Sequence, residues 1–125
     1  MTTLAGSTIG QVHISVTDVD RAVAFYRDTL GLPFLFRVPG QPMAFLQCGA
    51  TRLYLATPEE GFHSQPLLYF TVTAIDEAHA ALYEKGVEFR DEPHVVHRDD
   101  SVELWMAFFS DPDGCTLALM EERTV

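Results

Sequence analysis

Two segments of the chain alternate between apolar and polar residues in the manner of strands that bury one face. They cover residues 12–17 and 68–73, and a shift of 56 positions lays one on the other. The match continues beyond them, with Ala22 falling on Ala78. β-Branched residues are common in both segments, as they are in half-buried strands. The pattern therefore predicts an internal repeat in which a strand and a turn lead into a helix.

A helix is predicted after each of these strands. In the first copy Thr17 or Asp18 can cap the N-terminus, and Gly31 falls where a helix would end. In the second copy acidic residues favour the first turn, and Gly86 ends the helix. Each helix carries an apolar stripe at helical spacing, formed by Ala22, Phe25 and Tyr26 in the first and by Ala78, Ala81 and Leu82 in the second.

Three further strands are expected after each helix, because apolar runs there are separated by Pro, Asp and Gly residues typical of tight turns. They cover residues 34–38, 43–47 and 52–56, then 87–90, 104–109 and 116–120. The sequence thus predicts a single domain over residues 1–125, made of two βαβββ modules at about 9–56 and 67–120. Residues 57–66 and 91–101 are predicted to be irregular, the second a charged loop with two histidines.

The composition is that of an ordinary folded domain, with 47% hydrophobic and 21% charged residues among 125. A chain of this length can bury a core without a metal or a disulfide to hold it. It has no apolar run near the roughly 18 residues that cross a bilayer, and no signal peptide at its start. We therefore expect no membrane span and a cytoplasmic protein with Cys48 and Cys115 as free thiols.

The charge is strongly acidic, with a formal net value of −10. Residues 1–64 hold 4 bases and 5 acids, whereas residues 65–125 hold 4 bases and 13 acids. Such a balance repels phosphate backbones and anionic lipid surfaces, so we expect neither nucleic acid nor membrane as a partner. The acidic second half either keeps the protein in solution or attracts a cationic ligand, and charge alone leaves both open.

Several motifs, in this order, resemble those of the vicinal oxygen chelate superfamily. They are His13-Ile14-Ser15-Val16, Asp18 and Asp20, Ala24-Phe25-Tyr26, Leu30-Gly31-Leu32 and the closing Phe109-Ser110-Asp111-Pro112-Asp113-Gly114. The resemblance extends from about Ile9 to Met120. That superfamily groups glyoxalase I, bleomycin-resistance proteins, fosfomycin-resistance enzymes, extradiol dioxygenases and methylmalonyl-CoA epimerases. It implies an α+β fold whose tandem βαβββ repeats form a cupped mixed sheet with helices outside, and a homodimer.

The resemblance also indicates where a metal would bind, since enzymes of the superfamily carry His, Glu or Gln on the first and last strand of each half. The matching positions here are His13, Tyr54, Tyr69 and Ala118. A divalent cation needs about three nitrogen or carboxylate ligands. Alanine has no donor, and tyrosine binds such a cation well only as phenolate, which forms at a pKa of about 10. We therefore expect no metal and no other cofactor, with His13 hydrogen-bonded in a polar pocket.

Because every second residue of a strand shares a face, the same positions predict what lines the cup. Tyrosines there can stack on planar groups, and Arg52 can pair with an anion or stack on a ring. This favours a small-molecule ligand, although inner-face tyrosines can also simply pack. The predicted lining residues are Gln11, His13, Ser15, Arg52, Tyr54, Tyr69, Thr71, Ala118 and Met120.

Glu103 and Trp105 form a second candidate site, because their spacing places an acid and a large ring on one face, expected at the pocket mouth. The competing interpretation is that Trp105 belongs to the core and that His94 and His97 are loop residues. A displaced metal set of His13, His94 and Glu103 can be imagined, but no spacing in the sequence supports it.

Three functions follow from these patterns. The preferred one is a metal-independent protein, similar to the bleomycin-resistance branch, that holds an aromatic or planar small molecule. The second is a metal-dependent glyoxalase-like lyase, isomerase or dioxygenase with an unusual ligand set. The third is a metal-free enzyme in which Glu103 or His13 moves a proton and tyrosine hydroxyls stabilise an oxyanion. No catalytic residue is assigned, since neither cysteine lies in a nucleophile motif and no phosphate-binding loop is present.

Overall fold

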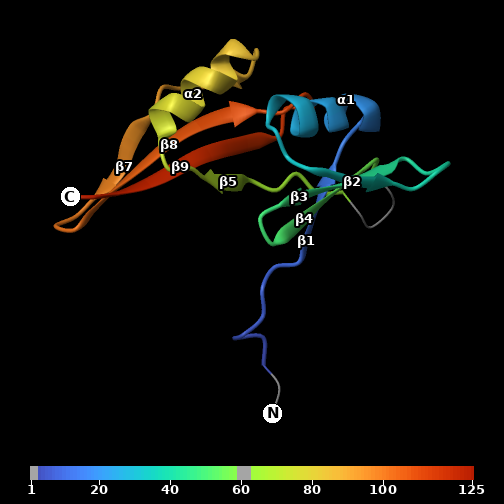
Figure 1. The fold of residues 1–125 in the computed structure, drawn as a ribbon, viewed down its shortest axis with the longest axis horizontal. Helices are drawn as coiled ribbons and strands as arrows, with labels where there is room; N and C mark the ends of the chain where they lie inside the picture. The colour runs from blue at the N-terminus through green and yellow to red at the C-terminus, as the bar shows by residue number, and fades with distance from the viewer. Residues whose placement is uncertain (1–2, 59–62) are drawn as a thin grey trace. The chain divides into compact units, whose positions relative to one another are not determined.

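The computed structural model describes residues 3–58 and 63–125. The chain divides into two compact units, Met1–Ser64 and Gln65–Val125, and each is described by itself (Figure 1). Of the irregular segment expected at 57–66, residues 59–62 lie outside the described part. The grouping of both modules into a single domain stays a prediction.

The first unit contains one four-stranded sheet and one helical segment. Its elements are β1 (Gln11–Ser15), α1 (Val19–Val23), η1 (Ala24–Thr29), β2 (Phe34–Arg37), β3 (Met43–Cys48) and β4 (Thr51–Ala56). The strand order is β1-β4-β3-β2. β1 runs parallel to β4, and the other neighbours are antiparallel.

The helical segment begins where the sequence predicts and changes form half-way. Asp18 is the cap, because its carboxylate accepts a hydrogen bond of 3.1 Å from the backbone N–H of Arg21. After α1 the chain widens into the π-helical η1, whereas a regular helix was expected. The segment ends before Gly31, whose φ of +82° suits glycine and confirms the predicted stop.

The core of the first unit lies between the helical segment and one face of the sheet (Figure 1). Burying each of its leucines contributes about 1.5–3 kcal/mol to folding. The opposite face of the sheet carries the polar and aromatic residues of the candidate site. The buried apolar side chains that alternate with the candidate-site residues are Ile14, Ala44, Leu46, Leu53 and Leu55 from the sheet, and the helical segment adds Val19, Ala22, Val23 and Tyr26.

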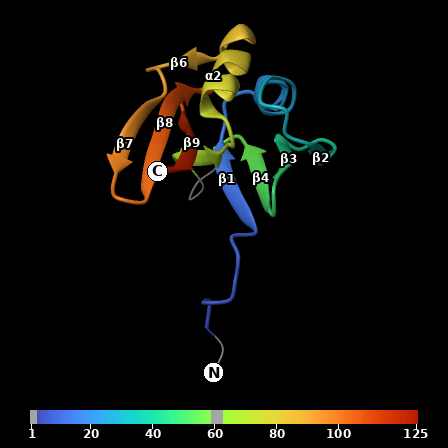
Figure 2. The same cartoon turned by 60° about the vertical axis from the view of Figure 1, so that its left-hand side comes forward.

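The second unit repeats this plan with one strand more. Its elements are β5 (Leu68–Thr71), α2 (Ile75–Glu84), β6 (Glu88–Phe89), β7 (His94–Arg98), β8 (Val102–Ser110) and β9 (Thr116–Thr124). The order is β5-β9-β8-β6, and β7 also pairs with β8. β5 is parallel to β9, while β8 is antiparallel to β9, β7 and β6 (Figure 2).

The expectation of a loop over residues 91–101 was wrong, because β7 lies within it. Charged residues and histidines are common on an edge strand, because few of its side chains need to pack in a core. In β7 they interrupt the alternation of apolar and polar residues by which a strand is recognised. A bulge between Val95 and His97 further interrupts the alternation. β8 and β9 are also longer than expected, because their charged ends continue the pairing as far as Val102 opposite Thr124.

α2 packs against β8 and β9 and closes the second core. The helix stops before Gly86, which has a φ of +90° as its predicted role requires. The fold is therefore α+β and built from βαβββ repeats, as the sequence predicts. Within the described residues, neither helix is long and apolar enough to span a membrane. The buried apolar residues of this unit are Ile75, Val87, Ala107, Phe109, Cys115, Leu117, Ala118 and Leu119.

Candidate functional site

The first and last strands of each unit bring the predicted positions together in pairs. His13 on β1 lies directly beside Tyr54 on β4, and Tyr69 on β5 lies directly beside Ala118 on β9. In both units these two strands are parallel neighbours, so partnered residues share a face. The structure thus forms two half-sites, one on each unit.

The half-site of the first unit is a row of rings that crosses all four strands. Phe36 on β2 stacks on Phe45 on β3 with 4.6 Å between ring centroids, and Phe45 stacks on Tyr54 at 4.8 Å. His13 completes the row with an edge contact of 4.9 Å to Tyr54. We call these four residues the aromatic row. It lies on the sheet face opposite the helical segment, since its strand positions alternate with the buried leucines.

Arg52 lies beside the aromatic row on the same face. Its guanidinium carbon is 5.3 Å from the centroid of the Phe45 ring, within the range of a cation–π contact. Its Nε donates a 2.8 Å hydrogen bond to the side-chain oxygen of Gln11. Among the described residues nothing accepts from its two terminal nitrogens, so this exposed cation can still bind an anionic oxygen.

Ser64 holds two of the polar side chains of β1, those of His13 and Ser15. Its backbone N–H donates to Ser15 Oγ at 2.8 Å, and its hydroxyl donates to the carbonyl oxygen of His13 at 2.7 Å. Because that hydroxyl has a single proton, its 2.8 Å contact with His13 Nδ1 requires the imidazole to donate. The neutral ring therefore carries its proton on Nδ1. Ser15 is 3% exposed, so it has little surface to offer a ligand, and its hydroxyl instead anchors Ser64 beside β1.

The half-site of the second unit is smaller. Tyr69 is 45% exposed and makes an edge contact with Phe108 on β8, with 6.3 Å between centroids. Ala118 lies on the strand between them and is fully buried. A small residue there leaves room for the two rings, which cover it.

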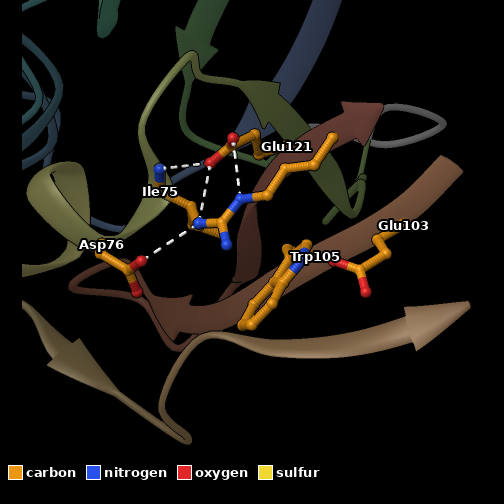
Figure 3. A network of polar contacts seen from close by, with 6 residues as sticks. Ile75, Asp76, Glu103, Trp105 and Glu121 are labelled. Atoms are coloured by element: carbon orange, nitrogen blue, oxygen red, sulfur yellow. Dashed lines mark hydrogen bonds and ion pairs between the residues drawn. The ribbon is translucent and has the colours of Figure 1, made fainter. Parts of the chain in front are cut away.

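Glu103 and Trp105 share a face, as predicted, but it is the wrong one for the expected pocket mouth. The unbroken pairing of β8 with β9 puts Phe108 beside Ala118 and Trp105 beside Glu121, which places Trp105 on the α2 side of the sheet. There the guanidinium of Arg123 lies 4.2 Å from the Trp105 ring centroid. Figure 3 shows Trp105 and Glu103 next to the contacts that join Glu121 to the start of α2.

Glu103 is already engaged in this network. It accepts hydrogen bonds from Trp105 Nε1 at 3.2 Å and from Arg98 Nε at 2.6 Å. The Trp105 hydrogen bond, followed by the Arg98 contact, lowers the pKa of the carboxyl group. A general base works best with a pKa near the working pH, so this shift weakens the case for Glu103 as a proton acceptor.

The donor set does not fit a divalent cation. Of the four positions that the resemblance assigns to metal ligands, His13 alone offers a nitrogen, and Ala118 offers nothing. Among residues 3–58 and 63–125 no three His, Cys, Asp or Glu side chains gather as a metal site. In the imagined displaced set, His94 pairs with Met106 and so lies on the face opposite Glu103. The residues at these positions therefore support no step through a metal.

Sequence reasoning missed Phe36, Phe45 and Ser64. The alternation rule was applied to the first and last strands of each half, and the two rings come from the strands between them. Phe45 shares a face with Tyr54 because the two are paired across the hairpin of β3 and β4, a pairing that extending the rule to β3 could have suggested. For Phe36 the rule would have failed, because a bulge between Phe34 and Phe36 interrupts the alternation of β2. Ser64 has no local signal, since it contacts β1 from about fifty residues away.

The amino-acid sequence of this chain is similar to those of known proteins. Residues 8–119 match the family model described as Glyoxalase/Bleomycin resistance protein/Dioxygenase superfamily. The uncharacterized protein YraH of Bacillus subtilis (strain 168) is 32% identical to this chain over an alignment of length 117, and the match covers 82% of this chain and 89% of that protein.

Solved structures show the same likeness. TnmS3, an antibiotic binding protein from Streptomyces sp. CB03234, is 25% identical with a TM-score of 0.76, over 97% of this chain and 100% of its own. Lactoylglutathione lyase from Agrobacterium tumefaciens is 24% identical with a TM-score of 0.74, over 92% and 93%, a likeness of fold alone. The family match covers most of the chain, so this protein belongs to the glyoxalase/bleomycin resistance protein/dioxygenase superfamily.

Proposed function

We propose that this protein is a metal-independent small-molecule binding protein that holds a planar aromatic ligand against the aromatic row. The observation that carries the proposal is the continuous stack of Phe36, Phe45 and Tyr54 on the sheet face opposite the helical segment of the same unit. Aromatic side chains on such a face provide apolar contact area with little conformational freedom to lose.

The ring geometry favours a flat ligand. Phe45 and Tyr54 are nearly parallel, with 12° between their planes, and Phe36 continues the stack at 24°. Phe36 ends the row on the edge strand and is 44% exposed, so a planar ring system can extend the stack there. Offset stacking of this kind contributes about 0.5–1.5 kcal/mol beyond the burial of area.

Arg52 narrows the class of ligand further. Its terminal guanidinium nitrogens can donate to a carboxylate next to the stacked ring, and they would repel a cation. We therefore expect a planar aromatic acid to bind better than an aromatic amine of the same size. The negative net charge does not oppose this, because the first unit carries nearly balanced charges.

The alternative, a metal-dependent lyase or dioxygenase, requires ligands that these positions lack. His13 would have to bind through Nε2 with help from groups other than Tyr54 and Ala118. Superfamily membership is compatible with either activity, since one fold supports many chemistries. The likeness to TnmS3, an antibiotic binding protein, supports the binding hypothesis. A homodimer, tested by light scattering at micromolar concentration, stays a prediction.

Calorimetric titration of 2-naphthoate into the full-length protein tests the proposal, with 2-naphthamide and cyclohexanecarboxylate as probes that lack the charge or the aromatic rings. We expect 2-naphthoate to bind best. Phe36→Leu should weaken its binding about threefold to tenfold, because the substitution removes one stacking ring.

Phe34→Leu provides a matched control on the same strand. Phe34 pairs with the buried Leu46 and so lies on the helix side, where the Arg27 guanidinium contacts its ring. This variant should bind 2-naphthoate as the unaltered protein does. If both substitutions weakened the binding of 2-naphthoate equally, or if all three probes bound equally well, the aromatic row would not be the binding surface.

A further inference from the structure

A groove in the second unit is lined by residues of α2 and of the segment in which β6 leads toward β7, none of which belongs to the half-site of that unit. Two adjoining hollows of about 310 Å³ and 230 Å³ share His79, Tyr83 and Glu92 in their walls. The first is completed by Ala80 and Glu84, and the second by Phe89, Arg90 and Asp91. We call this feature the α2 groove.

Aromatic rings form one wall of the α2 groove. The His79 imidazole packs on Phe89 with 4.0 Å between centroids. The Tyr83 ring is nearly parallel to the His79 ring, with 6.4 Å between centroids and 12° between the planes. Tyr83 is 67% exposed, so most of its ring is open to contact. The wall therefore offers ring surface to a ligand.

His79 also presents an unused polar atom in the groove. Its side chain is 12% exposed, and Nε2 is shielded from solvent without a hydrogen-bond partner among the described residues. The nearest carboxylate oxygen, from Glu92, is 3.8 Å away, which is too long for a hydrogen bond. A buried polar nitrogen without a partner costs free energy, so a donor placed between these groups would stabilise the site.

The charges around the groove favour a cationic donor. Glu84, Asp91 and Glu92 contribute three carboxylates, against one guanidinium from Arg90. The Arg90 guanidinium donates hydrogen bonds to Ser110 Oγ, at 3.3 Å from Nε and at 3.0 Å from Nη2. Asp91 accepts from the backbone N–H of Phe108, whereas the Glu92 carboxylate is 87% exposed. Glu84 and Glu92 are thus the carboxylates that can approach a ligand.

We propose that the α2 groove binds a small protonated aromatic amine. The ammonium group donates to His79 Nε2 and to the Glu92 carboxylate, and the ring lies against Tyr83. An ammonium has three donors, so one of them can reach His79 Nε2 when the imidazole carries its proton on Nδ1 and the exposed Glu92 side chain turns aside to admit the ligand. A neutral ligand would gain the ring contact without the ion pair. This site does not depend on the proposed function, because its chemistry and its unit both differ.

Two-dimensional ¹H–¹⁵N NMR of the full-length protein tests the proposal, with 2-phenylethylamine as the probe and 2-phenylethanol as its neutral counterpart. We expect saturable shifts at amides of residues 79–92 and binding of the amine about tenfold tighter than the alcohol. Shifts concentrated instead at Phe36, Phe45 and Tyr54 would overturn the assignment, as would equal affinity for the two probes or no saturable shift.

Variants identify the groups responsible. Glu92→Gln should weaken amine binding about threefold to fivefold, as expected for an exposed ion pair. His79→Phe keeps a ring against Phe89 and should weaken binding through loss of Nε2. Glu77→Gln, on an exposed position of α2 outside the groove, should leave the affinity unchanged. Because Glu92 is exposed, its variant tests the proposal even if His79→Phe does not fold; an unchanged affinity in Glu92→Gln would contradict it.

Discussion

The carboxylate of Glu121 on β9 accepts a 2.8 Å hydrogen bond from the backbone N–H of Ile75, the first residue of α2. The helix has Ala74 at its N-cap position, and alanine cannot satisfy the free N–H groups there. A residue 46 positions away thus supplies the cap. Arg123 holds that carboxylate in place at 3.0 Å and also contacts Asp76 at 3.1 Å (Figure 3).

Glu121→Ala should lower the free energy of unfolding by about 1–2 kcal/mol, because it removes the cap and leaves the N–H of Ile75 without an acceptor. Urea denaturation followed by circular dichroism measures the change. Glu122→Ala is the matched control, since Glu122 is exposed and pairs with Leu104 on the opposite face. Similar losses in both variants would show that Glu121 has no special role in starting α2.

Asp99 should make the turn between β7 and β8 sensitive to acid. Its carboxylate accepts from the Ser101 N–H, the Val102 N–H and the Ser101 hydroxyl, and these bonds lower its pKa from 3.8 to about 2. A lowered pKa in the folded state stabilises the protein above the unfolded pKa, and the gain disappears as the pH falls through about 2.

The measurement is urea unfolding of the protein and of Asp99→Asn between pH 6 and pH 2. The variant should be less stable above about pH 4, and the difference should shrink as the pH falls toward 2. Asp100→Asn, one residue further along the exposed turn, is the matched control for the loss of one carboxylate. A difference between protein and Asp99→Asn that stays constant with pH would contradict this explanation.

Cys115 should resist thiol reagents in the folded protein. It is 1% exposed, and burial, followed by the charges of Asp111 and Asp113, raises the pKa of its thiol to about 11. Relative to the ordinary value of 9.0, that leaves about one hundredth of the thiolate. Cys48 has a pKa raised by burial as well, but its side chain is only half-buried.

A disulfide exchange reagent at pH 8 measures this in Cys48→Ser and Cys115→Ser, each of which retains one thiol. Cys115 should react far more slowly than Cys48 in the native protein, and both should react at similar rates in urea. Rapid modification of native Cys115 would show that its surroundings open readily, which its packing in the second core does not allow.

The sequence predicted the parts of the fold that local chemistry determines. The glycines after each helix fix where the helices stop. The resemblance to the superfamily assigned His13, Tyr54, Tyr69 and Ala118 to corresponding positions, and the structure pairs His13 with Tyr54 and Tyr69 with Ala118. Period-two alternation puts Glu103 and Trp105 on one face. It could not say which face, because that depends on the pairing of β8 with β9 and on the side where α2 packs.

Features that depend on distant residues could not be predicted from the sequence. The residues of β7 have the composition of a charged loop, and they form a strand because they pair with β8. The cap of α2 comes from a strand near the end of the chain. The widening of the first helix into η1 likewise has no local signal in its residues. Ser64 holds His13 and Ser15 only because the chain returns to β1 after a long excursion.

The central claim is that ligand binding at the aromatic row needs no metal. Its most direct test is calorimetric titration of 2-naphthoate into chelator-treated protein and into the same protein resupplied with Ni²⁺, Mn²⁺, Fe²⁺ or Zn²⁺, with the metal content of each sample measured. We predict the same affinity in all samples, and a metal content that His13→Ala does not change. Binding that appears only with stoichiometric metal, and that is lost in His13→Ala, would contradict the account.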